Sequence, residues 1–244
     1  MAQRVLVTAG ANGVGLTIAR AFAADGARVH IADIDAVAVA AATRRGQLSG
    51  TVADLSDPTE AVRLIDDAHG RLGGLDVLVN NAGVTGPKAP VDALSAAAWS
   101  AVLDLNLTGT FLVTQAAVPL LRQSGRGAII VMSSLSGRFG HPGRIAYATT
   151  KWGLVGFTRT LAVELGQHGI TANTINPGPL ADPRRAGDES PASVEHQSIR
   201  RLVDPADVAA LAVFLAGPHA RTISGQTFPI DGDAHRAGAS PRPR

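Results

Sequence analysis

A tyrosine and a lysine four residues apart are the residues whose types and spacing most directly suggest chemistry. Tyr147 is the only tyrosine among 244 residues, and Lys151 is one of two lysines in a chain that carries 22 basic residues. On a helix this spacing puts both side chains on one face, one turn apart. A nearby ammonium favours ionisation of a phenol, whose pKa is ordinarily about 10. The two residues could therefore move protons together, or they could be an ordinary half-exposed pair.

A glycine-rich loop supplies a second candidate site. The stretch TAGANGVG, residues 8–15, lies between a short apolar segment and a helical one. Such a loop provides a tight turn, close approach of backbone to a pyrophosphate, and free N–H groups at a helix N-terminus. We expect dinucleotide binding by Gly10, Asn12, Gly13, Val14 and Gly15.

Asp33 stands eighteen residues after Gly15, at the end of the next apolar segment. A carboxylate there can accept both ribose hydroxyls of an adenosine and would repel a 2′-phosphate. The following residue, Ile34, offers no charge to a phosphate, so the sequence favours NAD over NADP. The alternative is that Asp33 caps a helix, although Asp35 could do that instead.

Alternating strands and helices must position these residues. Strands are expected at 4–8, 28–32, 50–53, 76–80, 128–133, 170–176 and 226–230, and they are apolar on both faces, as in a covered parallel sheet. Helices are expected at 14–24, 57–69, 98–122 and 145–165, with another starting at Asp204–Pro205. Asp57 with Pro58 marks the second start, and Gly166 is a stop signal. The pattern predicts a Rossmann-like, doubly wound α/β fold of about seven parallel strands, with helices on both faces in three layers.

Composition bounds the remaining possibilities. With 45% hydrophobic and 17% charged residues the chain is globular, and we expect one domain at 1–234 and a disordered tail at 235–244. The absence of cysteine excludes disulfides and thiolate metal sites, and we expect no metal. No apolar run approaches 18 residues, so no membrane span is expected. The net charge of +2 and the lack of basic clusters mixed with aromatics argue against nucleic acid. A cytoplasmic location is the default expectation.

Taken in order, the motifs resemble the short-chain dehydrogenase/reductase family, classical type, over nearly the whole chain. The matching features are TAGANGVG, Asp54 in VADLS, NNAG at 80–83, Asn106 in LNLTGTF, Ser134, the Tyr147–Lys151 pair and NPG at 176–178. The resemblance adds further expected cofactor contacts at Asp54, Leu55, Asn81, Ala82, Gly83, Tyr147, Lys151, Pro177, Gly178 and Leu180.

The resemblance implies an NAD(H)-dependent oxidoreductase that interconverts a secondary alcohol and a ketone by hydride transfer. Tyr147 would be the general acid or base, and Lys151 would lower the pKa of Tyr147 and hold the nicotinamide ribose. Ser134 would hold the substrate oxygen, and Asn106 would position a water molecule. Ser134 could instead cap a turn, and Asn106 could be structural.

Other expectations concern substrate, partners and departures from the family. The small-molecule substrate is expected to contact Leu135, Ser136, His141 and Ile145, although His141 could be a loop histidine. Ala9 replaces a family glycine, and Asp182 replaces a common threonine. The family uses the helix at 145–165 and the long helix before it as a subunit interface, which implies a homodimer or homotetramer. Two alternatives are an NAD-binding sensor or scaffold, which would not need Ser134, Tyr147 and Lys151 together, and an NADPH-preferring biosynthetic ketoreductase.

Overall fold

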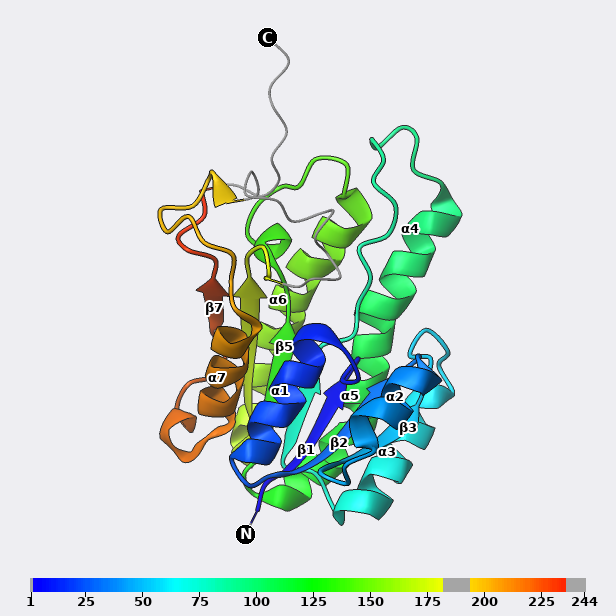
Figure 1. Ribbon diagram of the computed structural model, residues 1–244, viewed down its shortest axis with the longest axis vertical. Helices are drawn as coiled ribbons and strands as arrows, with labels where there is room; N and C mark the ends of the chain where they lie inside the picture. The colour runs from blue at the N-terminus through cyan, green and yellow to red at the C-terminus, as the bar shows by residue number, and fades with distance from the viewer. Residues whose placement is uncertain (1, 182–193, 236–244) are drawn as a thin grey trace.

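A single parallel sheet organises the chain. The computed structural model describes residues 2–181 and 194–235, and its seven strands lie in the order β3-β2-β1-β4-β5-β6-β7 (Figure 1). Their bounds are β1 Arg4–Thr8, β2 Arg28–Asp33, β3 Leu48–Val52, β4 Val77–Asn80, β5 Ala128–Met132, β6 Thr171–Pro177 and β7 Thr227–Ile230. Every neighbouring pair is parallel, which confirms the expected sheet.

Helices cover both faces of the sheet, as expected. One face carries α1 (Gly13–Ala24), α2 (Ala36–Thr43) and α7 (Pro205–Ala216), which share an apolar core with the sheet. The other carries α3 (Glu60–Leu72), α5 (Thr110–Ser124) and α6 (Ile145–Leu165) around a second core, with α4 (Ala96–Leu103) packed beside α6. Alternate side chains of a strand point to opposite faces of the sheet. Each core therefore contains the strand side chains that point to its own face.

One predicted helix start is wrong, and one predicted helix end is confirmed. Asp57 does not cap α3, because its Oδ1 accepts from the backbone N of Thr59 at 2.8 Å in a preceding turn, and the helix begins at Glu60. Helix α6 ends at Leu165 before Gly166, as predicted, and a 3-10 turn then leads to Gly169, whose φ is +68°. Asp204 does cap α7, as its Oδ1 accepts from the N of Ala206 at 2.8 Å.

The expected helix at 98–122 has an irregular centre. It runs from Ala96 to Ser124 in total, and residues Asp104–Gly109 form a π-helical turn between α4 and α5. By length and composition this 29-residue helix could cross a membrane, with a mean hydropathy of 1.3 in its most apolar window. Core helices pass the same test, and Val113, Ala117 and Leu121 are buried against the sheet.

A buried ionic cluster ties together the amino ends of three strands. Asp76 is fully buried, and its carboxylate contacts Arg4 at 2.7 Å and Arg126 at 2.9 Å and accepts from Ser124 Oγ at 2.6 Å. Burial favours the neutral acid, but these hydrogen bonds outweigh burial and hold the pKa of Asp76 well below its usual range. The cluster lies opposite the carboxyl edge, where ligands bind in such sheets.

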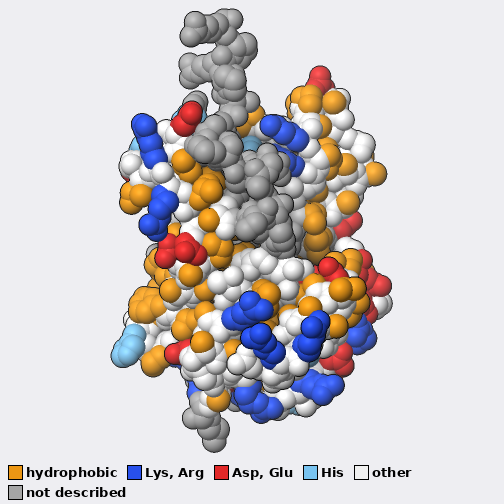
Figure 2. Space-filling view, viewed as in Figure 1, with side chains coloured by type: hydrophobic (Ala, Val, Ile, Leu, Met, Phe, Trp, Pro, Cys, Tyr) orange, Lys and Arg blue, Asp and Glu red, His pale blue; other side chains and the backbone are white. Residues whose placement is uncertain are grey.

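The surface in Figure 2 shows small separate groups of basic side chains among acidic and apolar ones. The expected disordered tail falls outside the described residues, apart from His235, and so does Asp182.

Candidate active site

A cleft opens at the carboxyl edge of the sheet beside β1, which lies between β2 and β4. This is the point at which the strand order reverses direction, and ligands bind there in such sheets. The cleft has a volume of about 470 Å³. Eleven of the expected cofactor residues line it, namely Asn12, Val14, Gly15, Asp33, Ile34, Asp54, Leu55, Asn81, Ala82, Gly83 and Leu180. Ala9, Ala32, Ala53, Val84 and Leu105 complete the lining, and none of them was among the expected cofactor contacts.

The glycine loop fits a pyrophosphate by shape and by hydrogen-bonding capacity. A Cβ at Gly15 would overlap the carbonyl oxygen of Ala9 and lie 2.5 Å from Asn81 Nδ2, so only glycine lets α1 start this close to the sheet. No side chain caps the N-terminus of α1, and its first N–H groups stay available to an anion. These features fit a bound dinucleotide.

Gly10 and Gly13 shape the loop without lining the cleft. A Cβ at Gly10 would lie 2.8 Å from a methyl of Ile31, and Gly13 has φ +49°. Four other expected contacts, Pro177, Gly178, Tyr147 and Lys151, also stand outside the lining. Gly178 donates to the Ile230 carbonyl at 2.8 Å and packs against Asp231.

Ala9 adopts a conformation that favours glycine. Its φ is +46°, in the left-handed region where a Cβ is strained. The carbonyl that this conformation directs accepts from Asn81 Nδ2 at 3.1 Å and faces Gly15. The replacement of the family glycine therefore preserves the loop but adds strain to it.

Thr8 fastens the loop after β4 to the end of β1. Its hydroxyl accepts from the backbone N of Asn81 at 2.9 Å and of Ala82 at 3.0 Å. Asn80 points away from the cleft and donates to Thr114 Oγ1 at 2.9 Å. The NNAG motif thus shapes the strand end, and Thr8 is a contributor that the sequence reasoning did not single out.

Asp33 and Asp35 divide the two roles considered for them. Asp35 caps α2, accepting from the N of Val37 and of Ala38 at 3.0 Å each. Asp33 is half-buried in the cleft wall, where its two oxygens accept from the N of Ala11 at 3.1 Å and of Asp35 at 3.2 Å. Those contacts fix the carboxylate and leave lone pairs for further donors.

Tyr147 and Lys151 lie one turn apart on α6, as the spacing predicts. Lys151 Nζ stands 5.5 Å from the centre of the Tyr147 ring and donates to the Met132 carbonyl at 2.8 Å. Lys151 is buried, and its Nζ would lie 3.5 Å from a Cβ on Gly83, beside the cleft. Lys151 therefore stands next to the expected nucleotide site, with the Tyr147 ring beside its Nζ.

Ser133 holds the end of β5 against α6. Its hydroxyl donates to the Lys151 carbonyl at 2.7 Å, while Lys151 Nζ bonds back to Met132. Gly137 lets the following turn pack closely against Ser133 and the Lys151 carbonyl, since a Cβ at this position would overlap Ser133 Oγ. These contacts bring Ser134 to the helix that carries Tyr147 and Lys151.

Ser134 caps the short turn Leu135–Gly137, accepting from the N of Ser136 at 3.2 Å. The capping alternative is therefore present in the structure. It does not exclude a second role, because a hydroxyl that accepts one hydrogen bond still has its own proton to donate.

Asn106 sits in the π-helical turn and is fully buried. Its Oδ1 accepts from the N of Val84 at 2.8 Å, and its Nδ2 donates to the Val84 carbonyl at 2.9 Å and to Thr150 Oγ1 at 3.0 Å. The side-chain amide thus links the loop after β4 to α6, which is the structural role considered as an alternative. Its backbone carbonyl accepts from Thr110 Oγ1 at 2.8 Å.

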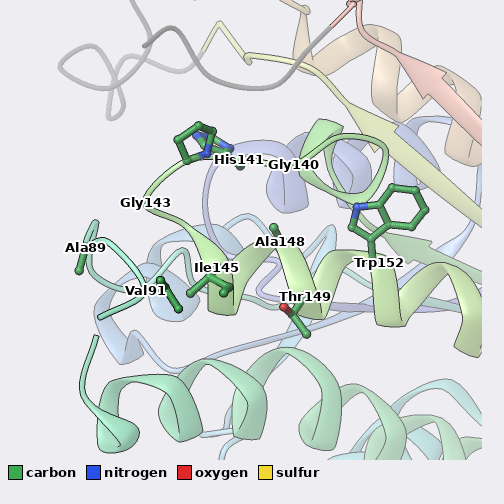
Figure 3. A pocket seen from close by; sticks show the side chains of 10 residues that line it. Ala89, Val91, Gly140, His141, Gly143, Ile145, Ala148, Thr149 and Trp152 are labelled. Atoms are coloured by element: carbon green, nitrogen blue, oxygen red, sulfur yellow. The ribbon is translucent and has the colours of Figure 1, made fainter. Parts of the chain in front are cut away.

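The four expected substrate residues lie apart from the nucleotide cleft. Leu135 is buried with Phe139 and Ala234, and Ser136 is buried beneath His141. His141 and Ile145 line a separate hollow of about 860 Å³ with Trp152 at one end and Val91 at the other (Figure 3). At 100° per residue, Ile145 and Trp152 point about 140–160° away from Tyr147 around α6. A substrate contact by these residues stays a prediction.

Among residues 2–181 and 194–235, no group of three or more His, Asp or Glu side chains could hold a metal ion.

Comparison with known proteins decides the family. A family profile described as enoyl-(acyl carrier protein) reductase matches residues 8–235. A solved structure described as a short chain dehydrogenase/reductase family protein superposes with a TM-score of 0.85 at 33% identity, covering 95% of this chain and 96% of the other. This chain is a short-chain dehydrogenase/reductase.

Curated relatives of this short-chain dehydrogenase/reductase act on different compounds by name. The 3-oxoacyl-[acyl-carrier-protein] reductase of Synechocystis is 35% identical over 95% of this chain and 96% of the relative. The 3-alpha-(or 20-beta)-hydroxysteroid dehydrogenase of Mycobacterium tuberculosis is 35% identical over 93% and 87%. The L-fucose dehydrogenase of Bos taurus is 40% identical over 87% and 82%. The chain is accordingly a nicotinamide-dependent enzyme that acts on alcohols and ketones.

Proposed function

We propose that this enzyme interconverts a secondary alcohol and a ketone with NAD(H), using Tyr147 as its general acid or base. The observation that carries the proposal is the position of the Tyr147–Lys151 pair. Lys151 is buried and 5.5 Å from the Tyr147 ring, and both belong to a helix anchored at the edge of the nucleotide cleft. The bound nicotinamide would take up or deliver the hydride, and residues of this chain would handle the proton and the substrate oxygen.

Tyr147 would remove the alcohol proton in oxidation and return it in reduction. The ammonium of Lys151 favours the ionised phenol, because opposite charges at close range stabilise each other in a buried setting. The ammonium is held in place by the Met132 carbonyl. Lys151 thereby serves the proton transfer without exchanging a proton itself.

Ser134 would hold the substrate oxygen by donating its hydroxyl proton. Its Oγ already accepts from the backbone N of Ser136 at 3.2 Å. That contact directs the hydroxyl as a donor toward another acceptor, and a ketone oxygen or an alkoxide is an acceptor. A fixed donor costs no reorganisation when negative charge grows on the substrate.

The preference for NAD rests on charge. Asp33 presents a fixed carboxylate in the cleft wall, and Ile34 beside it is 65% exposed and uncharged. Among the described residues that line the cleft there is no lysine or arginine. A 2′-phosphate would meet a negative charge without a compensating cation.

Replacement of Tyr147 tests the catalytic assignment. Tyr147→Phe keeps the ring but removes the hydroxyl, so turnover should fall by at least about 100-fold while NAD affinity stays nearly unchanged. Oxidation of a panel of secondary alcohols, followed by absorbance of the reduced nicotinamide, measures turnover, and calorimetry measures affinity. Trp99→Phe, on α4 and outside the lining of both the cleft and the separate hollow, is the matched control. Turnover of Tyr147→Phe close to that of the control would contradict the assignment.

A double substitution tests the cofactor preference. Asp33→Ala with Ile34→Arg should reverse the ratio of kcat/KM values for NAD and NADP, because it removes the carboxylate and adds a cation. A wild-type enzyme that already favours NADP would refute the role given to Asp33.

A reductive role with NADPH is the second candidate, and the name of the Synechocystis relative favours it. Measurement of both directions with both cofactors on one substrate pair separates the two candidates.

We also propose that the enzyme is a homo-oligomer. Phe111 of α5 and Trp152 and Val163 of α6 are 46%, 52% and 83% exposed, although their side chains are large and apolar. Burial of such surface against a second copy would stabilise an assembly. Light scattering coupled to size exclusion should give a dimer or a tetramer, and a monomer at micromolar concentration would refute this.

A further inference from the structure

The turn after β5 contains a short polar chain that ends on the proposed substrate-holding serine. Ser134 Oγ accepts from the backbone N of Ser136, and the hydroxyl of Ser136 lies 2.8 Å from His141 Nδ1. Ser136 is 2% exposed, so its hydroxyl depends on protein partners rather than on water.

We propose that His141 and Ser136 are positioning residues, which hold the Ser134 hydroxyl in the orientation that donates to the substrate oxygen. This inference rests on the proposed function of Ser134. It gives His141 a task inside the protein, whereas the sequence suggested a contact with substrate.

The direction of the central hydrogen bond can be derived by counting protons. Within the described part of the chain, His141 Nδ1 is the one hydrogen-bond partner of the Ser136 hydroxyl. A buried hydroxyl that does not donate its proton is destabilised. Ser136 therefore donates, His141 Nδ1 carries no proton, and the neutral ring bears its proton on Nε2.

The surroundings of His141 keep the ring neutral. Burial, and then the positive charges of Arg144 and Lys88, lower the pKa of His141 below its ordinary value. Arg144 is itself fixed, because it donates to the Gly86 carbonyl at 2.5 Å, and Lys88 packs on Gly143. A protonated ring would put a third positive charge here and would leave the Ser136 proton without its acceptor.

This bond adds a side-chain contact to a turn that backbone bonds already hold, from Gly137 N to the Ser134 carbonyl at 2.8 Å and from Arg138 N to the Leu135 carbonyl at 3.0 Å. His141 stands above the start of α6 in Figure 3, and Ser136 lies in the turn pressed on Lys151 through Gly137. The bond spans five residues and closes the loop between them. Removing the bond leaves the Ser136 hydroxyl buried without a partner, and a shift of Ser136 to relieve this would weaken the contact of its backbone N–H with Ser134 Oγ.

Steady-state kinetics in the direction of ketone reduction test the proposal. His141→Ala and Ser136→Ala should each lower kcat by about 2- to 10-fold with little change in KM, the equivalent of one hydrogen bond. His141→Asn should recover activity to within about twofold, because its amide oxygen can accept the Ser136 proton where Nδ1 did. His168→Asn, on an exposed turn, is the control. A raised KM at unchanged kcat in His141→Ala would instead show substrate contact and overturn the proposal.

A double-mutant cycle shows whether His141 acts through Ser134. In the Ser134→Ala background, His141→Ala should cause less than about a twofold further loss, because the group that it positions is gone. If the two substitutions instead lower kcat by independent factors that multiply in the double variant, His141 acts elsewhere and the proposal is refuted. If Tyr147→Phe is inactive while all His141 variants match wild type, the proposed function stands and only this inference fails.

Two further readouts do not depend on the size of the rate effect. Nitrogen NMR of enzyme with labelled histidine should show an unprotonated Nδ1 at His141 that changes in Ser136→Ala. The rate of ketone reduction should fall in acid in wild type, at a pH below the ordinary titration range of histidine, and not in His141→Asn, since reduction itself needs a protonated Tyr147. A protonated Nδ1, or the same acid loss in both proteins, would refute the assignment.

Discussion

Acid should weaken this fold through His30, a buried histidine remote from the cleft. His30 is 1% exposed on β2, with Nδ1 2.8 Å from Ser49 Oγ and Nε2 3.0 Å from Thr51 Oγ1. The Thr51 hydroxyl donates onward to Asp67 at 3.1 Å, so Thr51 must accept the Nε2 proton. A second proton on the ring would face Ser49 at the buried Nδ1.

The magnitude can be worked from the change in pKa on folding. Burial lowers the pKa of His30 from 6.5 to about 4, with Asp67 opposing this and Arg71 adding to it. Between these values the unfolded chain binds more protons than the folded one, so stability is complete above pH 6.5 and falls as the pH drops towards 4. The loss is about 2 kcal/mol at pH 5 and about 3 kcal/mol at pH 4.

Urea unfolding at several pH values, followed by circular dichroism at one protein concentration, measures this loss. His30→Leu removes the titrating group, and Ser49 and Thr51 keep their other acceptors at Val29 and Asp67. Between pH 7 and 5, the free energy of unfolding should therefore fall by about 2 kcal/mol less in the variant than in wild type. The exposed His168→Leu should behave as wild type. Parallel curves for wild type and His30→Leu would refute the reasoning.

Three further outcomes are expected from contacts in the glycine loop and the ionic cluster. Ala9→Gly should raise the free energy of unfolding by about 1 kcal/mol in urea titrations, because it removes left-handed strain, and an unchanged or lower value would contradict the strain. Gly15→Ala should abolish NAD binding measured by calorimetry, since the added methyl overlaps the Ala9 carbonyl; retained affinity would show that the loop is not so tightly placed. Asp76→Asn should cost about 3 kcal/mol of stability in thermal or urea unfolding, as it leaves Arg4 and Arg126 without their buried anion, and a loss below about 1 kcal/mol would show the cluster to be of little weight.

The sheet and the cleft could be predicted because local sequence and topology act together there. Apolar strands, a glycine loop and an acid after β2 can meet only at the carboxyl edge of a parallel sheet. Helix α6 was predicted with the bounds Ile145–Leu165 that the structure shows. The placement of Tyr147 and Lys151 one turn apart on this helix follows from helical spacing alone.

The wrong predictions arise where tertiary contacts override local signals. Helix α2 is nearly uniformly apolar from Ala36 to Thr43, so it has no periodicity to recognise. Asp57 carries a capping signature, but its carboxylate binds Thr59 one turn early. The hydrogen bond between His141 and Ser136 could not be predicted, because no spacing rule reveals it, and a substrate contact by His141 stays a prediction. Ser133 stands beside Ser134 in the sequence, but its role could not be predicted. That role depends on the packing of the end of β5 against α6.

The wide turn at Asp104–Gly109 has a consequence for how this helix can vary. A turn closed by i→i+5 bonds holds one residue more than an α-helical turn, so the helices on its two sides keep the same angular phase. Deleting one residue there would restore regular winding and leave Val113, Ala117 and Leu121 facing the sheet, but it would withdraw Asn106 from Val84 and Thr150. The extra residue in this segment therefore serves the contacts of Asn106, and its deletion should disturb the loop after β4 more than the packing of α5.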